Sequence, residues 1–273
     1  MKAALLHIAG AALAAVTGAS AAAQSPQPEM SIAQLTERIA ELEQRVQREE
    51  DKSAIEKLTR AYGYYVDKQL WDQVGGLFTT DARVEIAGRG VYRGTAGVDR
   101  LFREVMGGGQ IGLRSGALFN HLILQGIVDV QPDGKTALGR WRAFVQIGRY
   151  ERVAIWSEGT YENRYVKEDG VWKIADMHFY ATYYTPFDKG WRDGALPNNG
   201  PSSEYPPDEP QSVEYDVFPG HYVPPFHYPN PGTGEPWSVE KSRQYSTAGE
   251  APAPAPPPGD PANEAATPNS PQQ

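Results

Sequence analysis

Four long stretches of strand-forming residues follow one another over residues 117–184, and they constrain the fold more than any other feature of the chain. The stretches cover residues 117–130, 136–150, 153–167 and 171–184. Asp133-Gly134 separates the first two stretches and Asp169-Gly170 the last two, and Asp-Gly is a strong signal for a tight hairpin turn. Strands joined by short turns pair antiparallel, so the sequence predicts a meander of four long strands.

Helical patterns precede this meander. Apolar residues recur every three or four positions from residue 32 to residue 46, and the pattern continues through Ile55, Leu58 and Tyr62 to Asp67. This predicts one long helix, for which Ser31 is a candidate N-cap. Two shorter helices are expected over residues 70–78 and 95–106, and two short strands over residues 81–86 and 91–93. Three helices segregated to one side of a curved, mostly antiparallel sheet give an α+β fold. The helices and the bent sheet would form a cone whose open mouth can hold a small molecule.

Both ends of the chain differ in composition from its middle. Lys2, the apolar residues 3–19 and three alanines ending at Ala23 predict a secretory signal cleaved near Ala23, and hence a periplasmic or secreted protein. The alternative is a membrane anchor, although the apolar run is short for one; no later segment is apolar enough to span a membrane. Of the 23 prolines, 20 lie from Pro186 onward.

These composition shifts divide the chain into five expected segments. The segments are a signal peptide at 1–23, an amphipathic helix at 24–52, the main domain at 53–185, an irregular aromatic and Pro-rich arm at 186–249, and a disordered tail at 250–273. The amphipathic helix carries a short heptad seam of Ile32, Leu35, Ile39, Leu42 and Val46. We consider two interpretations equally: an arm that joins copies into a homodimer or homotrimer, and a helix packed on its own domain.

Composition excludes several classes of function. The net charge is −8, which argues against nucleic acid as a partner because phosphate binding requires clustered Lys and Arg. The chain contains no cysteine, so disulfides, thiolate nucleophiles, Cys-ligated zinc and iron–sulfur clusters are ruled out. The five histidines show no paired spacing such as HxH or HExxH, so we expect neither a metal site nor another cofactor.

Three positions stand out as candidates for chemistry. His121 lies in an apolar strand stretch, on the same expected face as Ile123 and Ile127, and is either a hydrogen-bonded core histidine or a general acid or base. Asp67 ends the first long helix. An Asp at this position is either simply exposed, or it orients a water, a substrate hydroxyl or a histidine at the cone mouth. His178, expected to share a face with Trp172 on the last strand stretch, is a weaker candidate.

Two tyrosines accompany Asp67 on the helix. Tyr64 lies three residues before Asp67, so both side chains could face one cavity. Tyr62 lies about 140° around the helix from Asp67 and would face it only if the helix ended irregularly.

Three parts of the chain resemble the SnoaL-like group of the nuclear transport factor 2-like superfamily, which includes the fungal scytalone dehydratases. The first is YGYYVDKQLWD at residues 62–72, followed by Leu77-Phe78 and Asp81-Ala82; the second is His121; the third is YVKEDGVWKI at residues 165–174. Together they cover residues 53–184. The resemblance implies a cone-shaped α+β barrel that is usually a dimer or trimer.

The resemblance also assigns roles to residues. In the dehydratase pattern a helix-end Asp and two strand histidines work without cofactor or metal. Asp67 falls on the Asp position and His121 on the first His position, whereas the second His position falls at Gln146 or Ile147 and an Asn position at Tyr161. These departures argue against scytalone itself as the substrate.

In the same register, the cavity face includes Ile86, Trp141, Val145 and Tyr161. Such an aromatic, mostly apolar wall suits an aromatic ligand. The layout with a Tyr- and Pro-rich tail is also similar to the cofactor-free sphingomonad lyases of lignin-derived diarylpropanes. Those enzymes lose a benzylic hydroxyl to give a quinone methide and then expel formaldehyde to form a stilbene.

The sequence therefore predicts a cofactor-independent lyase that acts on a small aromatic compound. His121 would act as general acid and then as base, alone or with Tyr161, while Asp67 orients His121 or accepts a substrate proton. Tyr62 or Tyr64 would position a phenol. Two alternatives stay open: an isomerase or aldol cyclase using the same pair, and a non-catalytic periplasmic binding or assembly protein.

Overall fold

The structure is a computed structural model that describes residues 30–247. The predicted signal peptide and the predicted tail from residue 250 lie outside the described residues. The chain divides into two compact units, Met1–Glu43 and Gln44–Gln273, and the boundary falls within the long helix α1 (Ile32–Asp67). At the start of α1, the Gln34 N–H donates to Ser31 Oγ at 3.3 Å, so the predicted N-cap is confirmed.

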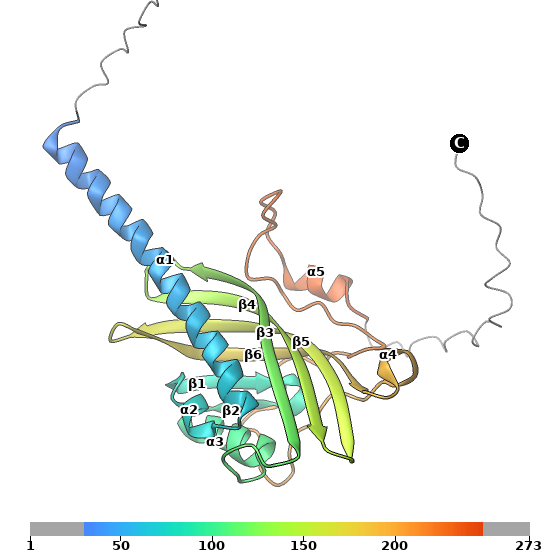
Figure 1. Cartoon of the computed structure of the whole chain (residues 1–273). Helices are drawn as coiled ribbons and strands as arrows, with labels where there is room; N and C mark the ends of the chain where they lie inside the picture. Colours follow the sequence, from blue (N-terminus) through green and yellow to red (C-terminus); the bar gives the residue numbers. More distant parts are fainter. Residues whose placement is uncertain (1–29, 248–273) are drawn as a thin grey trace, which may run out of the picture. The chain divides into compact units, whose positions relative to one another are not determined.

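A curved six-stranded sheet is the framework of the second unit (Figure 1). Its strands are β1 (Phe78–Ile86), β2 (Val91–Arg93), β3 (Ala117–Val130), β4 (Thr136–Arg149), β5 (Val153–Glu168) and β6 (Val171–Pro186). The strand order is β2-β1-β6-β5-β4-β3. Only the β1–β6 pairing is parallel. The predicted α+β fold and four-strand meander are confirmed, and the sheet stays open because β2 and β3 are edge strands.

The remaining helices are short. They are α2 (Trp71–Gly75), the 3-10 turn η1 (Ala87–Arg89), α3 (Gly94–Asp99), the π-helical turn η2 (Arg100–Met106), α4 (Gly190–Asp193) and α5 (Val239–Gln244). The helix predicted over residues 70–78 is shorter than expected, because Phe78 already pairs with Ile174 in the sheet. The helix predicted over residues 95–106 is present as α3 continued by η2.

The C-terminal half of α1 packs against one face of the sheet. Thr59 Oγ1 lies 2.8 Å from the Tyr165 hydroxyl on β5. At Gly63 the helix comes so close to β3 that a Cβ would lie 2.8 Å from the His121 carbonyl oxygen. A side chain at position 63 would therefore push the helix away from the strand that carries His121.

Asp51 fixes the middle of α1 to the hairpin between β5 and β6. Its Oδ1 accepts hydrogen bonds from the Trp172 indole at 2.9 Å and from the Lys167 ammonium at 2.6 Å. Burial alone would raise the pKa of Asp51, but these two hydrogen bonds outweigh it and hold the pKa below its usual value. Asp51 is therefore ionised and serves as an anchor for the helix.

The inward and outward alternation along β3 reverses at a bulge. The pairing of β3 with β4 shifts between Leu124 and Ile127, and Gln125 has a φ of 48°. Beyond the bulge Val128 is buried and Ile127 is exposed. The expectation that Ile127 shares a face with His121 is thus wrong, because an unpaired residue moves every later side chain to the other face.

The arm that follows β6 covers the face of the sheet opposite to α1. In residues 186–247, the Val91 N–H donates to the Glu209 carbonyl at 2.9 Å, which adds an isolated bridge beside β2. The Arg140 guanidinium stacks on the Phe226 ring at 3.8 Å. These contacts hold the described part of the arm to the chain's own domain.

Candidate active site

A cavity of about 240 Å³ lies between α1, the short helices and the inward face of the sheet. It is lined by Tyr62, Trp71, Ile86, Arg89, Val105, Met106, Phe119, His121, Val145, Ile147, Ser157, Tyr161, Phe179 and Tyr184. Most of these side chains are apolar or aromatic. The cavity holds Ile86, Val145 and Tyr161, which the register predicted for its wall, and the histidine of β3.

A hydrogen-bonded chain of three side chains runs along the cavity. His121 Nε2 lies 2.9 Å from the Tyr161 hydroxyl, and the Tyr161 hydroxyl lies 3.2 Å from the Tyr62 hydroxyl. The three groups come from β3, β5 and α1, and all are buried. Proton exchange along this chain needs only rotation of hydroxyl groups and a change of imidazole tautomer.

Burial sets the protonation states of this chain. It lowers the pKa of His121 to about 4 and raises the pKa values of Tyr62 and Tyr161 above their usual range. At neutral pH the imidazole is therefore neutral and both phenols keep their protons. A neutral imidazole beside two hydroxyl donors can take a proton from a ligand before it gives one back.

Three polar atoms of the wall are buried and have no hydrogen-bond partner among the described residues. They are His121 Nδ1, Ser157 Oγ and the indole Nε1 of Trp71. Buried polar atoms in folded proteins are nearly always satisfied, and those that line a cavity can be satisfied by a ligand or by water. All three residues line the cavity, but Trp71 Nε1 lies against Gly107, which is not part of the wall, so the Ser157 hydroxyl and the free His121 nitrogen are the candidates to bind a ligand.

Arg89 is a member of the wall that sequence reasoning missed. It lies in the turn η1 between two glycines, and its Nη1 donates to the Ile86 carbonyl at 3.3 Å. Within residues 30–247 no carboxylate lies at ion-pair distance from this guanidinium. Its charge also acts to lower the pKa of Tyr161, against the stronger effect of burial. An arginine in a glycine-flanked turn carries no sequence signal beyond its loop position, so only the fold reveals its role.

Asp67 acts on His121 through the main chain and not through the imidazole. Its Oδ1 accepts the backbone N–H of His121. Partial burial raises the pKa of Asp67, against the lowering effect of that hydrogen bond. Asp67 and Tyr64 line a second depression of about 350 Å³, which His121 also lines, and the Tyr64 side chain is 73% exposed. The expected side-chain pairing of Asp67 with His121 is absent, and Tyr64 stays outside the cavity wall.

Trp141 also lies outside the cavity, although it faces inward. Its ring packs on Gly126 at the β3 bulge, and its indole N–H donates to the Tyr165 hydroxyl at 2.9 Å. Trp141 therefore fills the part of the core under Thr59 of α1. The expectation that it forms a wall of the pocket is wrong in this respect.

His178 lies on the face opposite to the cavity. β6 has a bulge at Ala175, because Tyr165 pairs with Ile174 while Arg164 pairs with Asp176. The bulge turns His178 toward the arm. Its ring stacks on that of Tyr180, which also lies on β6, with 3.7 Å between the ring centroids. His178 therefore does not line the cavity around His121, where it was expected to bind substrate.

Glu85 lies next to His178 and connects this part of the sheet to the arm. Its fully buried carboxylate accepts the backbone N–H and the hydroxyl of Ser212 at 2.8 and 2.7 Å, and it pairs with Arg83 at 2.9 Å. His178 Nε2 lies 3.6 Å from this carboxylate. Burial nevertheless lowers the pKa of His178 to about 4. The cluster connects the arm to the sheet.

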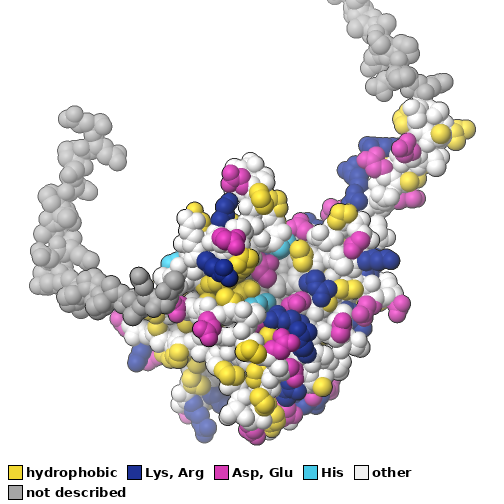
Figure 2. Space-filling view, turned by 180° about the vertical axis from the view of Figure 1, so that it is seen from behind, with side chains coloured by type: hydrophobic (Ala, Val, Ile, Leu, Met, Phe, Trp, Pro, Cys, Tyr) yellow, Lys and Arg dark blue, Asp and Glu magenta, His cyan; other side chains and the backbone are white. Residues whose placement is uncertain are grey.

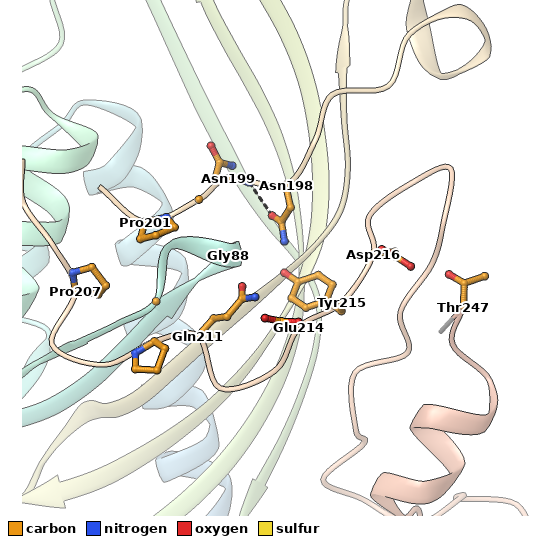
Figure 3. Close-up of a pocket in the computed structure, with 13 residues that line it drawn as sticks. Gly88, Asn198, Asn199, Pro201, Pro207, Gln211, Glu214, Tyr215, Asp216 and Thr247 are labelled. Carbon is orange, nitrogen blue, oxygen red and sulfur yellow. Dashed lines mark hydrogen bonds between the residues drawn. The ribbon is translucent and has the colours of Figure 1, made fainter. Parts of the chain in front are cut away.

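A larger hollow of about 700 Å³ lies between η1 and the arm (Figure 3). Figure 3 shows Asn198, Gln211 and Tyr215 around this hollow, and the Tyr215 hydroxyl already accepts the Ala181 N–H at 3.0 Å. Its lining contains amides, glycines, prolines and two carboxylates, Glu214 and Asp216, but no histidine. The cavity around His121 is therefore the better candidate for acid–base chemistry.

Two kinds of feature are absent from residues 30–247. No set of three or more His, Asp or Glu side chains in this part of the chain is arranged to hold a metal ion. None of its helices is long and apolar enough to cross a membrane. On the face shown in Figure 2, basic and acidic side chains are intermixed.

Comparisons with known proteins identify the domain type. Residues 47–178 match the model of a family described as a SnoaL-like domain. No curated protein sequence matches the chain. Among solved structures, the chain is similar to a provisionally assigned scytalone dehydratase from Novosphingobium aromaticivorans DSM 12444, with 19% identity and a TM-score of 0.46 over 57% of this chain and 96% of the other. It is also similar to the hexachlorocyclohexane dehydrochlorinase LinA-type3 from Novosphingobium barchaimii LL02, with 22% identity and a TM-score of 0.46 over 52% and 93% of the two chains.

Proposed function

Because residues 47–178 form a SnoaL-like domain, we propose that the chain is a cofactor-independent acid–base enzyme, a lyase, that acts on a small aromatic compound. The observation that carries this proposal is the buried chain from His121 Nε2 through the Tyr161 hydroxyl to the Tyr62 hydroxyl, inside an apolar cavity. A proton can enter or leave this chain without any cofactor.

The proposed substrate carries a phenol and a hydroxyl on the neighbouring benzylic carbon. Aromatic rings suit a wall of Phe119, Phe179 and Tyr184. Arg89 supplies the positive charge that a phenolate needs in a medium of low dielectric constant. A single substituted ring fits about 240 Å³, whereas pockets for larger ligands start near roughly 300 Å³. For a diarylpropane, the second ring would lie at the cavity mouth.

The reaction begins with removal of a proton. The neutral imidazole of His121 accepts the phenol proton, and the resulting phenolate lies beside Arg89. The electrons of the phenolate then move through the ring and expel the benzylic hydroxyl, which takes the proton back from the imidazolium directly or through Tyr161. The products of this step are water, a quinone methide and neutral His121, so atoms and charges balance.

A hydroxymethyl group on the next carbon allows a second step. His121 accepts the proton of that hydroxyl, the carbon–carbon bond breaks, and formaldehyde leaves. The bonding electrons restore the aromatic ring as a phenolate, which recovers the proton from His121 and leaves a stilbene. Loss of water alone is the expected outcome where the substrate lacks the hydroxymethyl group.

The test is a mass-spectrometric assay of the purified protein against phenolic benzylic alcohols and diarylpropanes. We expect a product lighter by water, or by water and formaldehyde, and a loss of turnover of about 10²- to 10⁴-fold in His121→Ala. His178→Ala is a matched control, because His178 is equally buried but lies outside the cavity. Turnover that survives His121→Ala in the folded protein would refute the mechanism.

Two other functions remain testable with the same material. An isomerase or aldol cyclase would use the same groups and give a product of unchanged mass. A non-catalytic binding protein is favoured by one observation: Tyr161 already satisfies His121 Nε2, as in a structural core network. In that case aromatic ligands should bind and be recovered unchanged.

A further inference from the structure

The exposed heptad seam of α1 has the residue pattern of a two-stranded coiled coil. Its five apolar side chains are 42–84% exposed. They are Ile32, Leu35, Ile39, Leu42 and Val46. Figure 2 shows apolar side chains lying among charged ones along this helix. An apolar stripe of this kind on a helix is normally buried, so it indicates a surface that binds a partner.

The choice of side chains in the seam specifies the number of strands. With Ile32 as position a, the a positions hold β-branched residues, Ile32, Ile39 and Val46, and the d positions hold Leu35 and Leu42. β-branched residues at a combined with Leu at d favour two strands over three or four. The boundary between the two compact units falls within this continuous helix.

The flanking charges specify the orientation. Position g holds Arg38 and Arg45, and position e of the following heptad holds Glu43 and Glu50. In a parallel pair, each g residue faces the e residue five positions later on the other helix, so Arg38 meets Glu43 and Arg45 meets Glu50. In an antiparallel pair, arginines would face arginines and glutamates would face glutamates, which is repulsive.

We propose that α1 binds the α1 helix of a second copy of this chain as a parallel, two-stranded coiled coil over residues 32–46. The seam ends at Val46, because Glu49 occupies the next d position and Asp51 is anchored to β5 and β6. Arg38, which pairs with Glu41 within its own helix, exchanges that exposed contact for one with the second copy. Two heptads give a weak dimer that a single change can break.

A cysteine placed in the seam tests the orientation, since the chain has no cysteine of its own. In a parallel pair, Leu35→Cys on each chain lies within disulfide range. In an antiparallel pair each d residue packs against an a residue, so residue 35 faces residue 46 when the whole seam overlaps, and the two cysteines are offset by about 16 Å along the axis. We expect mild oxidation of the full chain to give a covalent dimer for Leu35→Cys. The matched control Glu37→Cys, at the outer f position, should stay uncrosslinked.

Charge reversal tests the pairing. Arg38→Glu with Arg45→Glu, and separately Glu43→Arg with Glu50→Arg, should each raise the dimer dissociation constant by about tenfold or more. An equimolar mixture of the two variants should restore dimers, which sedimentation or light scattering measures. A wild-type chain that sediments as a monomer or trimer would overturn the proposal. So would equal crosslinking of both cysteine variants, or a wild-type dimer that both charge variants preserve.

Discussion

Acid should destabilise this protein well above the pH at which ordinary carboxylates titrate, because two histidines are buried in the neutral form. Burial lowers the pKa values of His121 and His178 from 6.5 to about 4. Below pH 6.5 the unfolded chain binds a proton at each histidine, whereas the folded chain does not until the pH approaches 4. Unfolding therefore takes up protons in this window, and stability falls as the pH falls.

The size of the effect follows from the two pKa values. For one histidine with a pKa of 6.5 unfolded and about 4 folded, lowering the pH from 7 to 5 removes about 2 kcal/mol of folding free energy. With both histidines the loss is about 4 kcal/mol, a large share of the roughly 5–15 kcal/mol that holds a domain together. Carboxylates with ordinary pKa values contribute little above pH 5.

Urea unfolding of the wild type, His121→Gln and His178→Gln at steps between pH 7 and pH 5 checks this reasoning. Each glutamine variant should lose about half of the pH dependence of the free energy of unfolding, whatever its stability at pH 7. Comparison with the wild type cancels the contributions of all other groups. Equal slopes for the three proteins would show that the two imidazoles titrate normally, which would refute their assignment as buried neutral groups.

Three further substitutions test other parts of the structure. Gly126→Ala places a Cβ 2.2 Å from the Trp141 ring and should cost about 1–3 kcal/mol by overpacking, whereas Gly75→Ala meets no atom within 4 Å and should leave the urea midpoint unchanged or higher. Arg140→Met removes the cation over the Phe226 ring in the arm, worth about 0.5–2 kcal/mol, and also the ion pair with Glu162, so limited proteolysis should cut the arm faster while the sheet stays resistant. Asp67→Ala leaves a backbone N–H of β3 without its acceptor and should cost about 1–3 kcal/mol with a lower kcat; Asp67→Asn, which keeps an acceptor oxygen, should restore most of both.

The fold was predictable because its signals are local. Hairpin turns at Asp133-Gly134 and Asp169-Gly170 delimit the long strands, and the apolar period of α1 stops at Val46 but resumes from Ile55 toward Asp67. The parallel pairing of β1 with β6 was not predictable, since it joins segments remote in sequence and has no turn to mark it.

The site was predictable only as far as strand alternation holds. His121 precedes the bulge in β3, so counting alternate residues placed it correctly on the inward face. His178 follows the bulge at Ala175 in β6, so the same counting placed it on the wrong face. A bulge adds one residue and has no reliable mark in the sequence. Asp67 was identified from the family pattern. That it binds the backbone N–H of His121, and not the imidazole, depends on how α1 packs against β3 in the fold.

The low pKa of His121 connects the acid sensitivity to the proposed chemistry. A histidine with an ordinary pKa would be about one-quarter protonated at pH 7, and that fraction could not accept a proton, whereas burial keeps the imidazole of His121 neutral. The same burial would make the imidazolium formed during a reaction a strong acid, ready to return its proton to a leaving hydroxyl. Replacing Phe119 or Phe179, which pack around the ring, by smaller polar residues should therefore raise the pKa of His121. Such a change would relieve the acid instability and slow the proposed turnover together, because both depend on keeping water away from one ring.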